Sequence, residues 1–275
     1  MAEKLKSIEQ RQNYVKKGVE AINGMLQSGS LSILWSLMEL QDHFDVKGNI
    51  AEIGVFQGKL LLLLCHWLNR GETAYGIDVY GTPPGRNQAD IDSFLENLKY
   101  FGFADSDCKL IVKDSFYLSA QDICDLAGGQ TIRLFSVDGD HSKEGVLHDL
   151  TIATASLCDG GVIIADDLFN AWYPTVTEAV YEYFRTEAAE EMEPIAFIAA
   201  NGPVETGAAK LLIARQGYAT KYKAGLKILN QDDLKHCDPF AGHKEVPTFW
   251  FASEPKKRTL DDYLVKILDD IFEDG

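Results

Sequence analysis

The chain has 275 residues, 46% of them hydrophobic, and a formal net charge of −16. This length and apolar content suffice for one large folded domain with additions. The negative charge argues against nucleic acids and anionic membranes as partners, because their recognition rests largely on Lys and Arg neutralising phosphates. No apolar run approaches the roughly 20 residues of a membrane-spanning helix, and the first residues lack the apolar segment of a secretory signal. We therefore expect a cytoplasmic protein.

Residues 1–47 are predicted to form a helical segment, because apolar residues recur at helix-like spacing. From residue 48 onward, short apolar strands alternate with helices. The expected strands are 49–53, 74–78, 109–112, 131–137 and 161–165. The expected helices between them are 59–68, 90–100, 119–126 and 143–157. This alternation predicts a Rossmann-like α/β fold, with a doubly wound, mostly parallel sheet flanked by helices and a ligand site beyond the carboxyl ends of the strands.

The last part of the chain is expected to close the sheet. After a helix over 176–189, two strand-like runs at 194–199 and 208–214 are joined by a turn-rich segment, which predicts a C-terminal antiparallel hairpin. Residues 48–215 thus form the expected main domain. Residues 216–275 are less regular and end in an acidic amphipathic segment, so we assign them to an extension that acts as a lid or as a contact in a homo-oligomer.

A glycine turn follows the first expected strand, in the sequence Glu52-Ile53-Gly54-Val55-Phe56-Gln57-Gly58. Gly54 and Gly58 allow a sharp turn and a close approach of the backbone to a ligand. Their spacing differs from the G-x-G-x-x-G turn that receives a dinucleotide pyrophosphate. The turn therefore favours a cofactor without phosphates.

Polar residues at the following strand ends complete an expected site for S-adenosylmethionine. Asp78 ends the second strand, where a carboxylate can accept hydrogen bonds from both ribose hydroxyls, and Asp114 and Ser115 follow the third strand, where an adenine would lie. Each feature alone could be an ordinary turn glycine or a solvated carboxylate. Their order at successive strand ends favours the cofactor site. Its predicted residues are Glu52, Gly54, Val55, Phe56, Gly58, Asp78, Asp114, Ser115 and Asp138.

Three carboxylates follow the fourth and fifth strands: Asp138, Asp166 and Asp167. Because parallel strands end at the same edge of a sheet, these side chains should converge beside the cofactor. Carboxylates so close together repel one another unless a cation lies among them or protons are retained. Oxygen ligands suit Mg²⁺, Ca²⁺ or Mn²⁺. The alternative is that Asp166 and Asp167 cap the following helix.

Three segments, 52–58, 137–146 and 164–167, resemble the macrocin O-methyltransferase family and its relatives in natural-product pathways. The resemblance covers residues 48–215. It implies an enzyme that methylates a hydroxyl of a sugar or related small molecule, commonly with a divalent metal such as Mg²⁺. It also implies that Asp138, Asp166 and Asp167 are metal ligands and that Asp140 or His141 is the general base.

Elementary acid–base chemistry favours His141 over Asp140 as that base. A histidine pKa of roughly 6.5 lies near working pH, whereas a cation beside an aspartate lowers its pKa and weakens it as a base.

Two other functions use the same kind of sheet. A nicotinamide-dependent oxidoreductase would need the pyrophosphate turn, which Val55–Gln57 do not resemble. A non-catalytic binding protein has no need of so much clustered charge.

Overall fold

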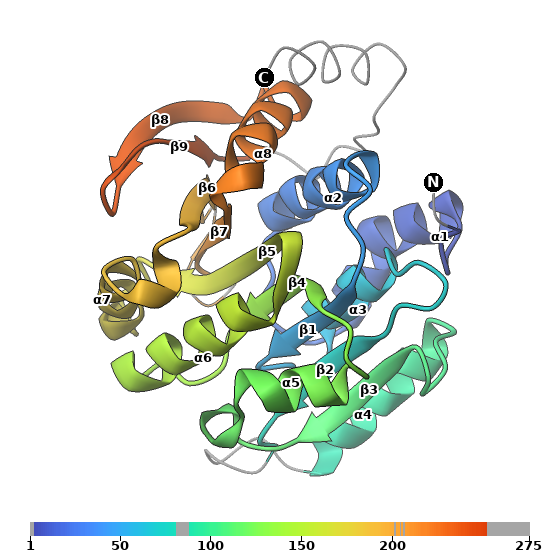
Figure 1. The fold of residues 1–275 in the computed structure, drawn as a ribbon. Helices are drawn as coiled ribbons and strands as arrows, with labels where there is room; N and C mark the ends of the chain where they lie inside the picture. The colour runs from blue at the N-terminus through green and yellow to red at the C-terminus, as the bar shows by residue number, and fades with distance from the viewer. Residues whose placement is uncertain (1–2, 81–87, 201, 204, 206, 252–275) are drawn as a thin grey trace.

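The computed structural model describes residues 3–80, 88–200, 202, 203, 205 and 207–251. They form one central sheet with helices on both faces (Figure 1). The strands are β1 (Asn49–Ile53), β2 (Ala74–Asp78), β3 (Cys108–Val112), β4 (Ile132–Val137), β5 (Leu157–Leu168), β6 (Met192–Ile198), β7 (Ala209–Arg215), β8 (Leu234–Phe240) and β9 (His243–Phe249). The helices are α1 (Ile8–Asn13), α2 (Ser28–His43), α3 (Lys59–Cys65), α4 (Gln88–Tyr100), α5 (Ala120–Leu126), α6 (Lys143–Ser156), α7 (Pro174–Tyr183) and α8 (Gln216–Leu229).

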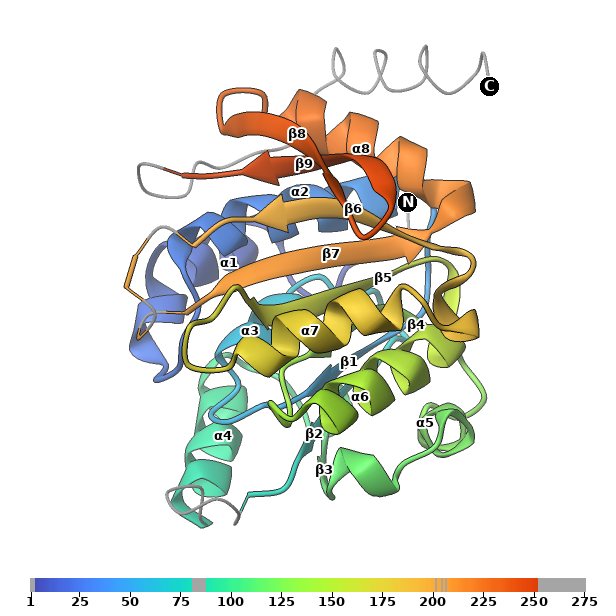
Figure 2. The ribbon, with the colours of Figure 1, turned by 90° about the vertical axis from the view of Figure 1, so that its left-hand side faces the viewer.

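The strand order is β3-β2-β1-β4-β5-β7-β6-β9-β8, and Figure 2 shows it from β8 at the top to β3 at the bottom. From β3 to β5 in this order, each strand is parallel to the next. Strand β7 runs antiparallel to both β5 and β6. The predicted Rossmann-like fold with its C-terminal antiparallel hairpin is thus confirmed.

The two faces of the sheet bury two hydrophobic clusters. Successive residues of a strand point to opposite faces, so Ile50 and Leu134 join the side chains of α2, α3 and α8 on one face. Ala51 and Phe135 join those of α5, α6 and α7 on the other. The predicted N-terminal helical segment supplies α2, most of which is buried against the sheet.

Residues 216–249 differ from the expectation of irregular structure. They form α8 and a β8–β9 hairpin, which joins the sheet through a parallel pair between β9 and β6. Most of β8 is exposed, so its sequence lacks the alternation of apolar and polar residues that marks a half-buried strand. The acidic segment near the end of the chain lies outside the described residues. Within the described part, the helices are all too short or too polar to cross a membrane.

Candidate functional site

A cleft of about 730 Å³ lies at the carboxyl ends of β1 to β4. This is the edge at which the sequence placed a ligand site. The predicted residues that line the cleft are Gly54, Asp78, Asp114, Ser115, Asp140 and His141. The other predicted residues of the first turn do not line the cleft: Glu52, Val55, Phe56 and Gly58.

The two glycines of the turn after β1 are required for steric reasons. Gly54 has a φ of +89°, and a Cβ atom there would lie 1.7 Å from the carbonyl oxygen of Asp138. Gly58 has a φ of +86°, and its Cβ would lie 2.6 Å from the ring of Phe94. Because side chains at either position would clash, the turn keeps the end of β1 against the end of β4 and leaves the backbone open to the cleft.

Asp78 holds the same turn from the end of β2. One carboxylate oxygen accepts the Phe56 amide proton at 2.9 Å, and the other accepts the Tyr80 amide proton at 3.1 Å. The hydroxyl of Tyr80 donates in turn to the carbonyl of Phe56 at 2.6 Å. Asp78 therefore fixes the backbone around the cleft as well as presenting a carboxylate to it.

The end of β3 supplies the opposite wall. Asp114 caps a short 3-10 turn by accepting the Phe116 amide proton at 2.9 Å. Ser115 is the buried first residue of this turn, while Phe116 is 54% exposed, and both line the cleft. Sequence reasoning missed Phe116, although an aromatic residue directly after a predicted strand end is a signal for stacking against a planar ring.

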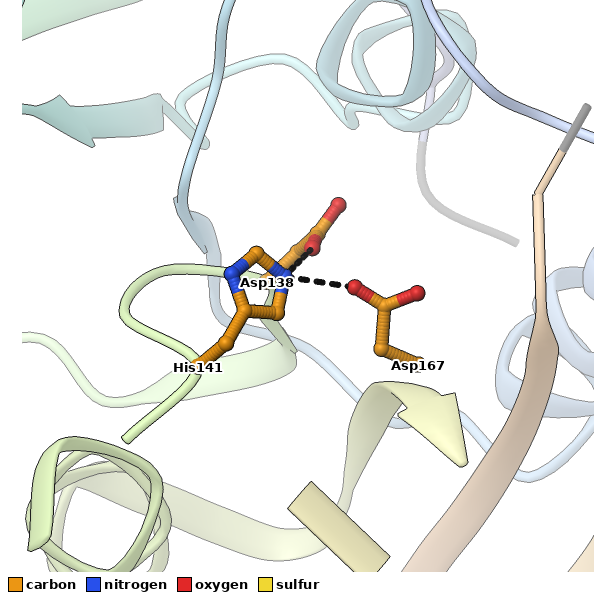
Figure 3. A group of neighbouring side chains, drawn as sticks. All are labelled: Asp138, His141 and Asp167. Carbon is orange, nitrogen blue, oxygen red and sulfur yellow. Dashed lines mark hydrogen bonds and ion pairs between the residues drawn. The ribbon is translucent and has the colours of Figure 1, made fainter. Parts of the chain in front are cut away.

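Asp138, His141 and Asp167 come together beside the cleft (Figure 3). His141 Nε2 lies 2.6 Å from Asp167 Oδ2 and 4.0 Å from Asp138 Oδ1. One ligand atom from each residue lies within 4.8 Å of the other two. We refer to these three residues as the acidic triad. The sequence placed Asp138 and Asp167 together, but it paired them with Asp166 and left His141 as a base.

The backbone at the end of β5 is irregular where it brings Asp167 into the triad. Asp167 and Phe169 both have positive φ values, 60° and 55°. Residues other than glycine rarely adopt this region, and strain of this kind persists where the surrounding structure holds it, often at functional sites. Asn170 Nδ2 donates to Asp167 Oδ1 at 2.8 Å and fixes the carboxylate from the other side.

His141 is held by contacts on three sides. Its ring stacks on Tyr173 with centroids 4.0 Å apart, and its carbonyl accepts the Thr175 hydroxyl proton at 2.8 Å. Burial alone would lower the pKa of His141, but the hydrogen bond to Asp167 and the surrounding carboxylates outweigh it and raise that pKa. Burial likewise opposes the negative charge of Asp167, and the bond from His141 outweighs it and lowers the pKa of Asp167.

The carboxylate of Asp140 is engaged by a residue outside the triad. It accepts the hydroxyl proton of Ser142, the N-cap residue of α6. His141 and Asp140 both line the cleft. The geometry thus separates two residues between which the sequence offered only a chemical preference for His141, since of the two only His141 contacts a carboxylate from β5.

Asp166 contacts a buried cation that the sequence analysis did not identify. Its carboxylate forms an ion pair with Lys210 of β7, and both side chains are almost fully buried. Glu52 of β1 lies nearby, with one carboxyl oxygen that has no hydrogen-bond partner among the described residues. Burial, and next the charge of Asp138, raise the pKa of Glu52 well above its ordinary value, while Lys210 opposes this rise. Lys210 thus neutralises charge directly behind the triad.

The chemistry of the triad fits a divalent cation. Two carboxylate oxygens and one imidazole nitrogen are donors that Mn²⁺, Fe²⁺ or Zn²⁺ accept, and Mg²⁺ binds commonly through one or two carboxylates with water completing its shell. Asp138 and Asp167 supply those oxygens. Asp166 faces Lys210 instead, so its side chain is engaged elsewhere.

Comparison with known proteins agrees with this geometry. Residues 51–168 match a family model described as a methyltransferase domain, a segment that runs from β1 to the end of β5 and contains the glycine turn and the triad. A search of curated protein sequences finds no match.

Solved structures share the fold. The O-methyltransferase from Bacillus cereus in complex with S-adenosylhomocysteine has a TM-score of 0.51 and 14% identity over 77% of this chain and 92% of that chain. The O-methyltransferase NovP has a TM-score of 0.51 and 18% identity over 68% and 79% of the two chains. A calicheamicin methyltransferase has a TM-score of 0.50 and 17% identity over 76% and 92%.

Proposed function

We propose that this chain is an S-adenosylmethionine-dependent O-methyltransferase that acts, with a divalent cation, on a hydroxyl of a small molecule such as a sugar or a natural-product intermediate. The observation that carries the proposal is the arrangement of the acidic triad at the edge of the cleft, within a segment that matches a methyltransferase domain. The resemblance to the macrocin O-methyltransferase family supports the same class of acceptor.

The cofactor would lie along the cleft. The open backbone at Gly54 suits the methionine portion, Asp78 suits the ribose hydroxyls, and the Ser115–Phe116 wall suits the adenine. A cofactor bound in this way would present its methyl group to the residues at the ends of β4 and β5, where the triad lies. Glu52 is buried behind the first turn, so its side chain would not contact the cofactor. The residues of this turn would act mainly through the shape of their backbone.

The triad supplies what methyl transfer to an alcohol requires. An alcohol with a pKa of roughly 15 is a poor nucleophile at neutral pH, and a divalent cation supplies stabilisation of its alkoxide. Asp138 and Asp167 would hold that cation. In the neutral tautomer whose Nε2 donates to Asp167, His141 would have Nδ1 free to accept the proton of the hydroxyl. Tyr173 and Thr175 keep the ring in this orientation, and alignment of oxygen, methyl and sulfur is the remaining task.

Cofactor binding and metal dependence test the proposal separately. Calorimetry should show binding of S-adenosylhomocysteine and none of NAD; the reverse result would replace the proposal with an oxidoreductase. Turnover of S-adenosylmethionine with a panel of hydroxylated small molecules should stop after exhaustive chelation and return with Mg²⁺ or Mn²⁺. Full turnover in chelated enzyme would remove the metal from the mechanism and leave Asp167 as the partner of His141 alone.

A further inference from the structure

A second cavity of about 590 Å³ shares no lining residue with the cofactor cleft, and its lining includes Asn170, a hydrogen-bond partner of Asp167. It lies between the end of β5, α7, the β6–β7 pair and the β8–β9 hairpin. We call it the aromatic pocket, after the four rings among its lining residues: Phe169, Tyr181, Phe197 and Phe240. Its volume is in the range of sites that bind small organic molecules.

The rings of the aromatic pocket pack against one another at its base. Phe240 lies 4.8 Å from Phe197 and 4.6 Å from Tyr181, measured between ring centroids. Phe169 lies 5.6 Å from Phe197 but is itself 61% exposed. Leaving such a large apolar ring in contact with water is unfavourable. The exposed face of Phe169 therefore has the properties of a surface that a planar apolar group would cover.

The aromatic pocket and the triad share a wall. Asn170 lines the pocket and donates its side-chain amide to Asp167. Phe169 follows Asp167 by two residues, and both have positive φ angles. The carboxylate of Asp167 lies in the triad, whereas the ring of Phe169 lines the aromatic pocket. A molecule with a hydroxyl at the triad could thus extend into the pocket past this short segment.

The charged side chains of the pocket belong to the β8–β9 hairpin. Of the described lining residues, only His236 and Asp238 have acidic or basic side chains, and they form a 3.0 Å pair that is largely exposed. The remainder of the described lining is apolar, uncharged or backbone. This distribution suits a ligand that is apolar in its body and polar at one end.

We propose that the aromatic pocket binds an aromatic or fused-ring portion of the methyl acceptor, whose hydroxyl lies at the triad. This inference rests on the proposed function, because it names the class of acceptor for the same site. It predicts that hydroxylated fused aromatic compounds are better acceptors than simple sugars, which would leave the pocket empty.

The probe for this proposal is 2,3-dihydroxynaphthalene, with methyl glucoside as the compound that lacks an aromatic part. Two variants change the pocket: Phe169→Ala removes an exposed wall, and Thr248→Trp fills the space from a half-buried position on β9. Tyr100→Ala removes a ring that is 79% exposed on α4, away from both cavities, and serves as the matched control. Circular dichroism and calorimetric titration with S-adenosylhomocysteine establish that each variant is folded and retains its cofactor site.

Binding of the naphthalene diol, measured by calorimetry without cofactor, should weaken about tenfold in Phe169→Ala, as the loss of one aromatic contact implies. It should fall further in Thr248→Trp and stay at the wild-type level in Tyr100→Ala. If Thr248→Trp does not fold, Phe169→Ala decides alone.

Two results would overturn the pocket assignment: folded pocket variants that bind the naphthalene diol with wild-type affinity, or methyl glucoside that is methylated as fast as the diol. In either case, binding of S-adenosylhomocysteine would leave the proposed function standing. Failure of the wild-type protein to bind S-adenosylhomocysteine would instead remove the proposed function, and with it the acceptor role of the pocket.

Discussion

The two halves of the sheet contribute to the site in different ways. In the parallel half, from β3 to β5, the ends of β2, β3, β4 and β5 each carry a polar residue that faces the cleft or belongs to the triad, and these residues stand in short local motifs. In the mixed half, from β7 to β8, no comparable motif follows a described strand. This half contributes a single buried cation, Lys210, and the walls of the aromatic pocket. The difference indicates that the groups of the candidate site stand in local motifs, whereas the buried ion pair behind them and the aromatic pocket come from strands that are distant in sequence.

The largest expected effect concerns the parallel half. His141→Ala should reduce turnover about 10²- to 10⁴-fold, the usual contribution of a general base, while affinity for S-adenosylhomocysteine and Mn²⁺ stays near wild type. Single-turnover kinetics and calorimetry measure the two properties. Asp140→Asn is the matched control, because its carboxylate faces Ser142. Loss of turnover in Asp140→Asn with retention in His141→Ala would transfer the role of base to Asp140, and loss of Mn²⁺ affinity in His141→Ala would make His141 a metal ligand.

The next effect tests the support from the mixed half. Lys210→Met leaves the buried carboxylate of Asp166 without its partner, so the free energy of unfolding should fall by about 3–5 kcal/mol. Adding Asp166→Asn should restore part of this loss, since the uncompensated charge is then removed. Urea unfolding measures both. Lys223→Met breaks the partly exposed pair with Glu193 and should cost clearly less. Equal losses for the two lysines would contradict a special role for Lys210.

The third prediction concerns the pH dependence of stability, which we expect to arise from a histidine in the helices over the parallel half and not from the site. His66 is buried, its ring lies 4.3 Å from that of Tyr14, and burial lowers its pKa from 6.5 to about 4. The unfolded chain therefore binds this proton at higher pH than the folded one. Stability falls as the pH decreases from 6.5 toward 4, and below pH 4 the protonation of His66 causes no further change.

The variant His66→Phe keeps an aromatic ring in place. Between about pH 7.5 and about pH 5, its free energy of unfolding should fall by about 2 kcal/mol less than that of the wild type. Urea unfolding at the two pH values gives the comparison. Parallel losses in the two proteins would assign the acid sensitivity to other groups.

The smallest effect concerns cofactor affinity. Asp78→Asn removes acceptor capacity from a carboxylate that already holds two amide protons, so affinity for S-adenosylhomocysteine should fall about tenfold, the value of one or two hydrogen bonds. Calorimetry measures it, with Asp105→Asn in an exposed turn as the control. Unchanged affinity in folded Asp78→Asn would remove Asp78 from the ribose site.

The sequence by itself determined the parallel half. The alternation of strands and helices, the glycines at Gly54 and Gly58, and the carboxylates after β4 and β5 are local signals, because each depends on the backbone geometry of a few consecutive residues. The carboxyl-end rule for parallel strands then sufficed to place Asp138 and Asp167 together.

Only the tertiary structure decided which groups meet beyond that. Asp166 and Asp167 are neighbours in sequence, yet one pairs with Lys210 and the other with His141, because consecutive residues at the irregular end of β5 point to opposite sides. Lys210 and the β8–β9 hairpin reach the site through pairing between strands far apart in the chain. Such contacts depend on how elements pack together, and no local pattern of residues records them.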